Sequence, residues 1–305
     1  MRDLKIIFMG TPEFAVPSLQ ILIDNKYEVV AVITAPDKPK GRGQKVSVSP
    51  IKEVALKHEI PCLQPKNLKA PEFIKELKSY NANLQVVVAF RMLPEVVWDM
   101  PEYGTFNLHA SLLPQYRGAA PINWAIINGE KETGVTTFLL KHEIDTGNII
   151  FQDKEPITEE DTVGSLYERL MFKGSKLVLK TTEAIRNEEY HLKEQASNKE
   201  LRKAPKIFKE DCEIDWTKKA EDLRNFIRGL SPYPGAWTTL NNKNYKIFKV
   251  EYSPEDYEIG SGEIVSDDKA FVDVQTGDDA LRLIQFQPEG KRKMEVTDFL
   301  KGNKV

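Results

Sequence analysis

Short apolar runs alternate with amphipathic segments along the first 190 residues. Largely apolar runs at residues 4–9, 29–33 and 86–89, the last of them continuous, are typical of buried parallel strands. Between them, residues 14–24 carry apolar side chains at helical spacing, and a helix from Pro50 to about His58 has Ser49 as its N-cap. This alternation of strand and helix predicts a doubly wound α/β domain with a mostly parallel sheet.

The same alternation continues to about residue 190 and then stops. The pattern predicts strands at 106–109 and 136–140 and helices at 121–127 and 163–186. Residues 191–206 are polar and charged, which is typical of a linker. Short β-type runs follow from Gly235 onward, at a spacing that suits a small barrel or sandwich. We therefore expect three parts: a domain at 1–190, a linker at 191–206 and a β domain at 207–305.

Composition narrows the class of protein. The 305 residues are 41% apolar and 29% charged, with a net charge of −3, so no global attraction to nucleic acid is expected. No apolar run approaches the roughly 18 residues of a membrane span, and the first ten residues do not read as a signal peptide. The two cysteines, Cys62 and Cys212, give neither a disulfide framework nor a multi-cysteine zinc site. We expect a cytoplasmic protein that does not associate with membranes.

The most informative stretch is residues 105–121. Its strand alternates, so Asn107 and His109 project from the same face of an otherwise apolar segment. Such a pair either forms hydrogen bonds at the end of a sheet or does chemistry. An asparagine amide can donate to a developing oxyanion, and a histidine exchanges protons near neutral pH.

A carboxylate follows a later strand, in Asp145-Thr146-Gly147. The tripeptide is typical of a turn, and an aspartic-protease site would need a second matching loop that the chain lacks. Asp145 follows one strand, and Asn107 and His109 end another, so we expect them to converge at one edge of the sheet. An aspartate there would favour the protonated imidazole and fix the orientation of its ring.

Two other kinds of site, a metal centre and a dinucleotide site, are less well supported by the sequence. A metal-dependent hydrolase could draw ligands from His109, His142, Glu143 and Asp145, but their spacing does not match a metal-binding motif. The Gly10-Thr11-Pro12 turn lacks the further glycines of a dinucleotide fingerprint.

Basic residues gather in two segments. The loop at 36–45 carries four cations, Lys38, Lys40, Arg42 and Lys45, against one aspartate. Its two glycines and two prolines argue against regular structure. A second cluster around Lys206 lies in the predicted linker. Either segment alone is typical of a solvated surface, whereas the two together favour RNA contact.

These motifs together resemble the folate-dependent formyltransferases. Residues 106–121 match Phe-Asn-Leu-His-x-Ser-Leu-Leu-Pro-x-Tyr-Arg-Gly-x-x-Pro, and residues 145–149 match Asp-Thr-Gly-x-Ile. Five further strings, at 8–14, 36–43, 204–207, 227–237 and 290–302, are similar to the branch that formylates methionine on initiator tRNA. Two positions depart from the family pattern: Arg91 stands where glycine is common, and the segment before Asp145 reads His-Glu-Ile.

The resemblance implies a fold, a reaction and site residues. It implies a Rossmann-like catalytic domain and a C-terminal barrel similar to the oligonucleotide-binding fold. The donor would be 10-formyltetrahydrofolate, the acceptor methionyl-initiator tRNA, and no metal would be needed; we expect a monomer. Asn107, His109 and Asp145 would be catalytic. The residues implied at the folate site are Phe90, Met92, Leu93, Ser111, Leu112, Leu113 and Pro114, and those at the tRNA site are Lys38, Lys40, Arg42, Lys45 and Lys206.

Two alternatives to this reading stay open besides the hydrolase. The same catalytic trio would serve a formyltransferase that acts on a small amine, such as a sugar nucleotide or a ribonucleotide. That substrate would need neither the basic loop nor the C-terminal domain. A non-catalytic RNA-binding protein could also keep the fold, although binding alone does not need Asn, His and Asp in one pocket.

Overall fold

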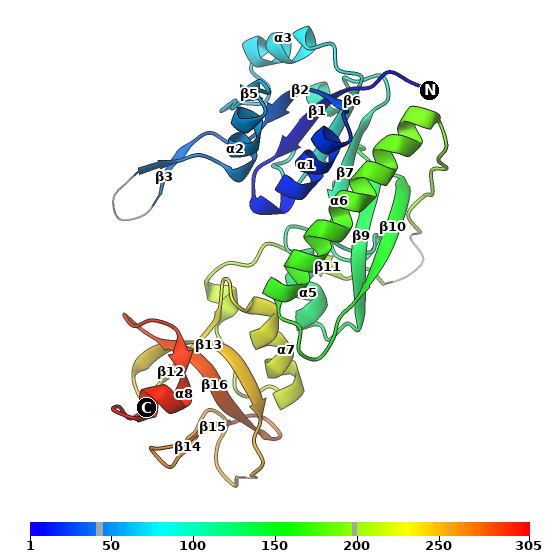
Figure 1. The fold of residues 1–305 in the computed structure, drawn as a ribbon. Helices are drawn as coiled ribbons and strands as arrows, with labels where there is room; N and C mark the ends of the chain where they lie inside the picture. Colours follow the sequence, from blue (N-terminus) through cyan, green and yellow to red (C-terminus); the bar gives the residue numbers. More distant parts are fainter. Residues whose placement is uncertain (41–44, 197–199, 256) are drawn as a thin grey trace. The chain divides into compact units, whose positions relative to one another are not determined.

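The computed structural model of the chain describes residues 1–40, 45–196, 200–255 and 257–305 (Figure 1). The chain forms two compact units, each made of several segments. Unit 1 comprises Met1–Gly118, Gly134–Glu155 and Tyr167–Lys203. Unit 2 comprises Ala119–Thr133, Pro156–Leu166 and Ala204–Val305.

Unit 1 is built on a seven-stranded sheet with the order β10-β9-β7-β6-β1-β2-β5. The neighbouring pairs from β7 to β5 are parallel, as the apolar runs predicted. The α/β prediction for this part of the chain is confirmed. The strands are β1 Lys5–Gly10, β2 Glu28–Ile33, β5 Cys62–Leu63, β6 Leu84–Val88, β7 Thr105–His109, β9 Glu132–Leu139 and β10 Ile149–Pro156.

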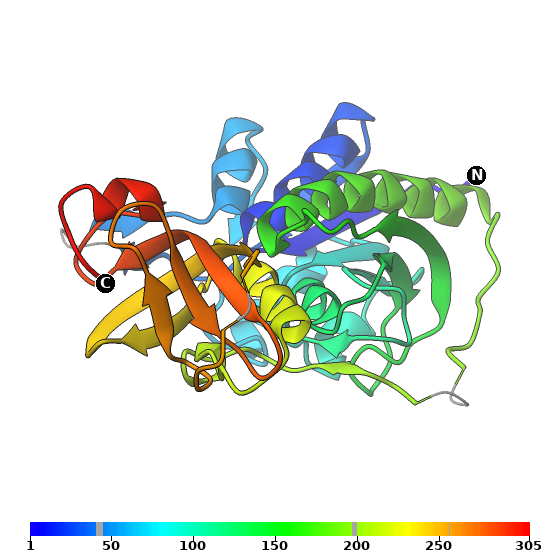
Figure 2. The ribbon, with the colours of Figure 1, turned by 90° about the horizontal axis from the view of Figure 1, so that it is seen from below.

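Helices cover both faces of this sheet. Ile7 and Met9 of β1 pack in one cluster with Phe73 of α3 and Val97 of α4. On the other face lies the long helix α6, which runs across the strands in both ribbon views (Figures 1 and 2). Ser49 accepts a hydrogen bond from the backbone of the first turn of α2, which confirms the predicted cap. The helices are α1 Val16–Asp24, α2 Pro50–Lys57, α3 Pro71–Ser79, α4 Glu95–Trp98 and α6 Val163–Asn187, and a 3-10 turn, Glu13–Ala15, precedes α1.

One local expectation was wrong. The basic segment 36–45 is not wholly irregular, because β3 (Lys38–Lys40) and β4 (Lys45–Ser47) pair as a two-stranded antiparallel ribbon. A proline is tolerated there because a two-stranded ribbon has only edges. β9 runs antiparallel to β7, with Phe106 opposite Leu139 and His109 opposite Thr136. The carboxyl end of β9 therefore lies beside the start of β7.

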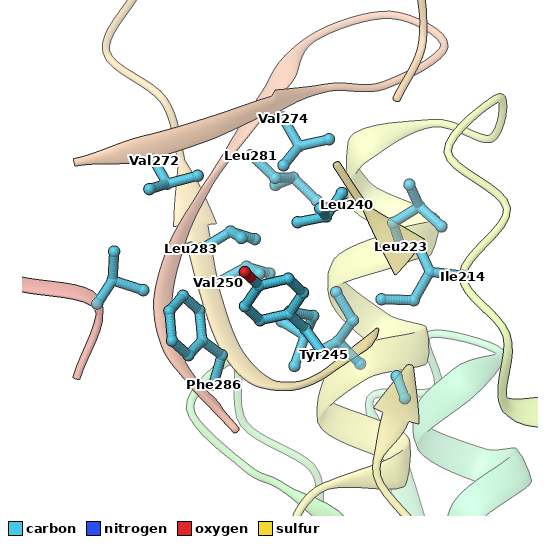
Figure 3. Packing of buried hydrophobic residues seen from close by; sticks show 14 of the residues in the cluster. Ile214, Leu223, Leu240, Tyr245, Val250, Val272, Val274, Leu281, Leu283 and Phe286 are labelled. Carbon is cyan, nitrogen blue, oxygen red and sulfur yellow. The ribbon is translucent and has the colours of Figure 1, made fainter. Parts of the chain in front are cut away.

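Unit 2 is an antiparallel sheet with helices packed on it. The strand order is β12-β13-β16-β15-β14, and β17 pairs with β16. The strands curl, and apolar side chains such as Tyr245, Leu283 and Phe286 fill the inside of the curve (Figure 3). This confirms the predicted β character of the C-terminal part of the chain. Its elements are α5 Pro121–Ile127, α7 Ala220–Leu230, α8 Val296–Leu300, β12 Ala236–Leu240, β13 Lys243–Tyr252, β14 Ile264–Ser266, β15 Val272–Gln275, β16 Ala280–Pro288 and β17 Met294–Glu295, with a 3-10 turn at Glu210–Cys212.

Within the described residues, no helix is both long enough and apolar enough to cross a bilayer.

Candidate active site

The end of β7 presents Asn107 and His109 from one face of the sheet. The residue between them, Leu108, points to the opposite face, where a Cβ at Gly174 of α6 would lie 2.7 Å from a Leu108 methyl group. Asn107 is half-buried, and His109 is only 6% exposed. Within the described part of the chain, no group is hydrogen-bonded to the Asn107 side-chain amide, so its N–H groups are available to a ligand.

The two ring nitrogens of His109 face different partners, one in a hydrogen bond and the other at ion-pair distance. Nε2 lies 2.8 Å from the carbonyl oxygen of Tyr116, which can only accept, so Nε2 carries the proton of this hydrogen bond. Nδ1 lies 3.9 Å from Oδ2 of Asp145. Tyr116 is itself in the left-handed region, with φ of 58°. The turn after β7 thus aims a carbonyl back at the strand and leaves Nδ1 facing the carboxylate.

The Asp145 loop is tightly built. Asp145 has φ of 55°, which is strained for a residue with a side chain. Its Oδ2 accepts a hydrogen bond of 3.1 Å from the backbone N–H of Gly118. Gly147 packs against β9 so closely that a Cβ there would lie 1.6 Å from the Leu139 carbonyl oxygen. Only glycine fits at that position without moving the loop.

Asp145 reaches His109 by a route that the sequence pattern did not predict. We expected the ends of two strands to meet at one edge of the sheet. Since β9 is antiparallel to β7, its carboxyl end lies beside Thr105, at the opposite end of β7 from His109: the backbone N–H of Leu140 donates to the Thr105 carbonyl. The loop after β9 therefore folds back over the sheet and brings the carboxylate to the imidazole.

The segment that we predicted as a linker also lies against this site. Lys193 exchanges backbone hydrogen bonds with Ile149 at the start of β10. Two residues later, the Gln195 side chain contacts the carbonyls of Asp145 and Gly147 and the guanidinium of Arg117. The sequence analysis did not single out Gln195. No periodicity marks it, since the contacts join positions about 50 and 78 residues apart.

The four residues Ser111–Pro114 form a bend that is anchored by its neighbours. Ser111 is fully buried; its hydroxyl donates to the Gln115 carbonyl, and its own carbonyl accepts from Thr136. Leu113 is 3% exposed, and its carbonyl accepts from Gln152. Leu112 and Pro114 are half-buried. The bend is rigid, and Leu113 belongs to a small apolar cluster with Phe138 and Ile149.

The second segment predicted for a folate site follows β6. Phe90 and Leu93 are half-buried against the core cluster of this face, whereas Met92 is 72% exposed. Arg91 stacks 5.7 Å from the centre of the Phe90 ring, and its guanidinium donates to the carbonyls of Pro65 and Lys66. The Arg91 side chain is therefore held at the surface by these contacts and is not part of the bend at Ser111–Pro114.

A metal site receives no support from the placement of the candidate ligands. Nδ1 of His142 lies 3.3 Å from the Glu95 carboxylate, and the His142 side chain is 82% exposed. Glu143 is exposed as well. Across the described ranges, no group of three His, Cys, Asp or Glu side chains is arranged to hold a metal ion.

The residues predicted to contact tRNA fall in two places. Lys38, Lys40 and Lys45 belong to the β3–β4 ribbon, whose base is fixed by hydrogen bonds from Lys52 and Gln64 to the Asp37 carboxylate. Hydrogen bonds with those two side chains hold the pKa of Asp37 below its usual value. Arg42 lies outside the described residues. Lys206 lies in unit 2, where its ammonium sits 4.9 Å from the centre of the Phe208 ring.

Unit 2 contains a groove of about 990 Å³ with basic and aromatic walls. We call it the lysine–aromatic groove; its lining includes Lys206, Phe208, Lys209, Tyr233, Trp237, Lys246 and Glu289. Phe208 is 55% exposed and Tyr233 is 80% exposed. Lys246 donates to the Pro234 carbonyl at 2.8 Å, beside Tyr233. Three ammonium groups against one carboxylate make this groove suitable for an anionic ligand with flat rings.

Comparison with known proteins gives a family for both parts of the chain. The formyl transferase family matches residues 4–182, and the formyl transferase C-terminal domain matches residues 206–304. The methionyl-tRNA formyltransferase of Azobacteroides pseudotrichonymphae is 57% identical, over 98% of this chain and 96% of that protein. The Bacteroides fragilis protein of the same name is 52% identical, over 99% and 95%.

Two solved structures share the fold. HypX from Aquifex aeolicus, crystallised with tetrahydrofolic acid, is 20% identical with a TM-score of 0.66, over 99% of this chain and 48% of the HypX chain. WlaRD, a sugar 3N-formyl transferase, is 24% identical with a TM-score of 0.67, over 96% of this chain and all of WlaRD. At these identities the likeness concerns the fold.

Proposed function

The chain belongs to the formyl transferase family, and from this premise we propose that it transfers a formyl group from 10-formyltetrahydrofolate to the α-amine of methionine on initiator tRNA. The observation that carries the proposal is the meeting of Asn107, His109 and Asp145 on one face of the sheet in unit 1. The names of the relatives that span nearly the whole chain support the acceptor.

The chemistry needs an amine made neutral and an oxyanion stabilised. The methionine nitrogen attacks the formyl carbon, and a C–N bond forms as the carbonyl oxygen becomes an oxyanion. Asn107 and protonated His109 would donate to that oxygen, each donor being typically worth about 3 kcal/mol of barrier. The bond from carbon to N10 then breaks. Asp145 would accept the proton that the amine loses, and N10 gains a proton, so that tetrahydrofolate and the formyl amide are the products.

The orientation of the ring fits this role. Because Nε2 donates to the Tyr116 carbonyl, the free ring nitrogen is Nδ1, which faces Asp145. With Nε2 donating, Nδ1 can donate to the oxyanion only in the doubly protonated ring, and that protonated Nδ1 would be a charged donor. We therefore assign His109 to oxyanion stabilisation and Asp145 to proton transfer.

The donor would lie along the two loops that flank this trio. A pterin needs flat apolar contacts together with backbone donors and acceptors at its edge. Phe90, Met92 and Leu93 after β6 supply apolar surface, and Met92 is exposed enough to contact a ligand. The bend at Ser111–Pro114, anchored by Thr136 and Gln152, would supply rigid backbone groups. Both loops belong to unit 1.

The acceptor would be bound chiefly through phosphates and unpaired bases. The lysine–aromatic groove of unit 2 supplies ammonium groups and exposed rings, which suit single-stranded RNA. The basic segment around β3 and β4, with Arg42, would contact the acceptor stem. We further infer that the reaction takes place in the cytoplasm, by a monomer.

A competition between acceptors tests this proposal. The purified chain is mixed with 10-formyltetrahydrofolate and with methionyl-initiator tRNA, a nucleotide-linked amino sugar and free methionine, and the formylated products are measured. We expect transfer to the charged tRNA at a kcat/KM at least about two orders of magnitude above that for either small amine, since only tRNA can engage the groove. Faster transfer to the amino sugar would replace the proposed acceptor, and no transfer to any amine would refute the reaction.

A further inference from the structure

The side-chain amide of Gln195 makes four hydrogen bonds at the active site. Its Oε1 accepts from Nε of Arg117 at 3.0 Å and from Nη2 of Arg117 at 2.6 Å. Its Nε2 donates to the carbonyl oxygens of Asp145 and Gly147, both at 2.8 Å. A guanidinium can only donate and a carbonyl can only accept, so a single orientation of the amide satisfies all four bonds.

These contacts join the two segments that hold the catalytic carboxylate. Gly118, which follows Arg117, donates its N–H to Oδ2 of Asp145. Asp145 and Gly147 form the loop that folds back from β9, and Asp145 has a strained backbone with φ of 55°. Gln195 thus fixes the main chain of the loop and also the segment that supplies a donor to its side chain.

Gln195 is itself well fixed. Lys193, two residues earlier, exchanges both backbone hydrogen bonds with Ile149, at 2.8 and 2.9 Å. Ile149 begins β10, two residues after Gly147. The segment around residue 195 is therefore tied to the same stretch of chain that its side chain holds, and all of these residues belong to unit 1.

We propose that Gln195 is a positioning residue for formyl transfer, which sets the Asp145 carboxylate against His109; this rests on the function proposed above. Only a neutral amide of this length suits the site. A glutamate would still accept from Arg117 but would turn oxygen lone pairs toward two carbonyls. A lysine would donate to the carbonyls but would repel Arg117. A displacement of about 1 Å in an active site can cost about a hundredfold in rate. Because Gln195 positions Asp145 and does not itself contact a substrate in this proposal, we expect its replacement to lower kcat and to leave substrate binding unchanged.

The test uses Gln195→Glu in the full-length chain, with Glu194→Gln as the matched control. Glu194 is the exposed neighbour, and its replacement changes charge without touching the four hydrogen bonds of the Gln195 amide, which we call the clamp. We expect Gln195→Glu to lower kcat by about 10- to 100-fold, with KM for both substrates within about threefold of wild type. Glu194→Gln should leave both constants unchanged. A folded Gln195→Glu protein with kcat within twofold of wild type, or with a loss confined to KM, would overturn the proposal.

A second readout separates this proposal from the function. The ring signal of His109 in NMR spectra of the free protein, assigned by comparison with His109→Asn, should shift in Gln195→Glu and stay in place in Glu194→Gln. The signals of the other three histidines should not move. If the wild-type chain fails to formylate methionyl-tRNA, the proposed function is refuted. The His109 signal still tests the clamp in that case. An unmoved His109 signal would overturn the positioning role.

A further variant covers the case in which Gln195→Glu does not fold. Arg117→Met removes the guanidinium and leaves both donations from Gln195 to the Asp145 loop intact. We expect a fall in kcat of about 3- to 10-fold with KM unchanged and a displaced His109 signal. Wild-type kcat together with a wild-type His109 signal in this variant would contradict the clamp.

Discussion

The candidate active site of unit 1 and the lysine–aromatic groove of unit 2 present polar groups in opposite ways. Around His109 the side chains are buried or half-buried, and the imidazole, the carboxylate and the Gln195 amide make internal hydrogen bonds. In the groove, Phe208 and Tyr233 are more than half exposed. Bond formation requires groups whose positions are fixed before the substrate arrives, whereas nucleic-acid binding requires rings and charges that a flexible strand can reach.

We expect the largest effect on activity from substitutions in the candidate active site. Replacement of His109 or Asp145 by alanine should lower kcat by at least about two orders of magnitude, because each removes a group used in the transition state. Affinity for charged tRNA, measured by filter binding, should stay within about threefold. His191→Ala, an exposed histidine in the same unit, is the matched control. Normal turnover in either alanine variant would falsify the catalytic assignment.

The next largest effect concerns the stability of unit 2. Asp273 is fully buried and accepts hydrogen bonds from Arg282, Ser253 and Tyr257. Burial opposes its ionisation, but these bonds outweigh burial and lower the pKa of Asp273. Asp273→Asn should cost about 3 kcal/mol in urea unfolding at pH 7, since it leaves a guanidinium poorly paired. Asp268→Asn, at an exposed ion pair with Lys304, should cost less than about 1 kcal/mol.

The sign of the pH dependence follows from that shift. A carboxylate whose pKa is lower in the folded than in the unfolded chain contributes stability above its unfolded value of about 4. The contribution is lost as the pH falls through the lower pKa of the folded state. The difference between wild type and Asp273→Asn should therefore be full at neutral pH and shrink at pH values below about 4. A difference that grows on acidification would contradict this account.

The groove should give a smaller effect, on binding alone. Tyr233→Ala removes a ring on which a base can stack, an interaction worth about 1 to 3 kcal/mol per base. We expect KM for methionyl-tRNA to rise about fivefold to tenfold, with kcat unchanged. Tyr252→Ala, an exposed tyrosine of unit 2 outside the groove lining, is the control. An equal fall in kcat would mean that the groove takes part in the chemistry after all.

Two lysines on one strand provide a second test of RNA binding by the groove. Lys246 lines the groove, whereas Lys249, also on β13, does not and is paired with Glu251. Lys246→Ala should weaken tRNA binding and reduce the slope of log affinity against log salt by about one. Lys249→Ala should change neither quantity. Identical slopes for the two variants would leave net charge, and not the groove, as the cause.

The smallest effect is expected at a surface network of unit 2. Hydrogen bonds with Lys131 and Arg224 lower the pKa of Glu159 to about 2. The Glu159 side chain is 54% exposed, so solvent screens the pairs, and Glu159→Gln should cost less than about 1 kcal/mol in thermal unfolding at pH 7. That cost should disappear as the pH falls from 4.5 toward 2, the interval over which the carboxyl becomes protonated in the unfolded and then in the folded chain. A loss as large as that of Asp273→Asn would contradict the assumed screening.

The elements with clear periodicity were predicted well. The apolar runs became β1, β2 and β6, and the amphipathic segment at 163–186 became α6 within one residue. β10 was missed because its second half, Gln-Asp-Lys-Glu-Pro, is polar and lies at the edge of the sheet, where one side of the strand needs no partner. The helix α3 was missed as well, since only two of its nine residues are buried.

In the candidate site too, the sequence could place some residues and not others. Asn107 and His109 could be placed on a common face because alternation along a strand is a local property. The proximity of Asp145 was expected for the wrong reason, because strand direction is not encoded in apolar spacing. Gln195 escaped notice altogether, since its role arises only where three distant segments meet.

The order of residues by itself determined the α/β and β character of the two parts, the face shared by the amide and the imidazole, and the family to which the chain belongs. Periodicity and short motifs are local, and they survive in any arrangement of the elements. The tertiary structure alone decided that β9 runs against its neighbour, that the carboxylate loop folds back over the sheet, and that a segment resembling a linker clamps it. Those features depend on pairings between distant positions, which are selected by the free energy of the whole packed unit.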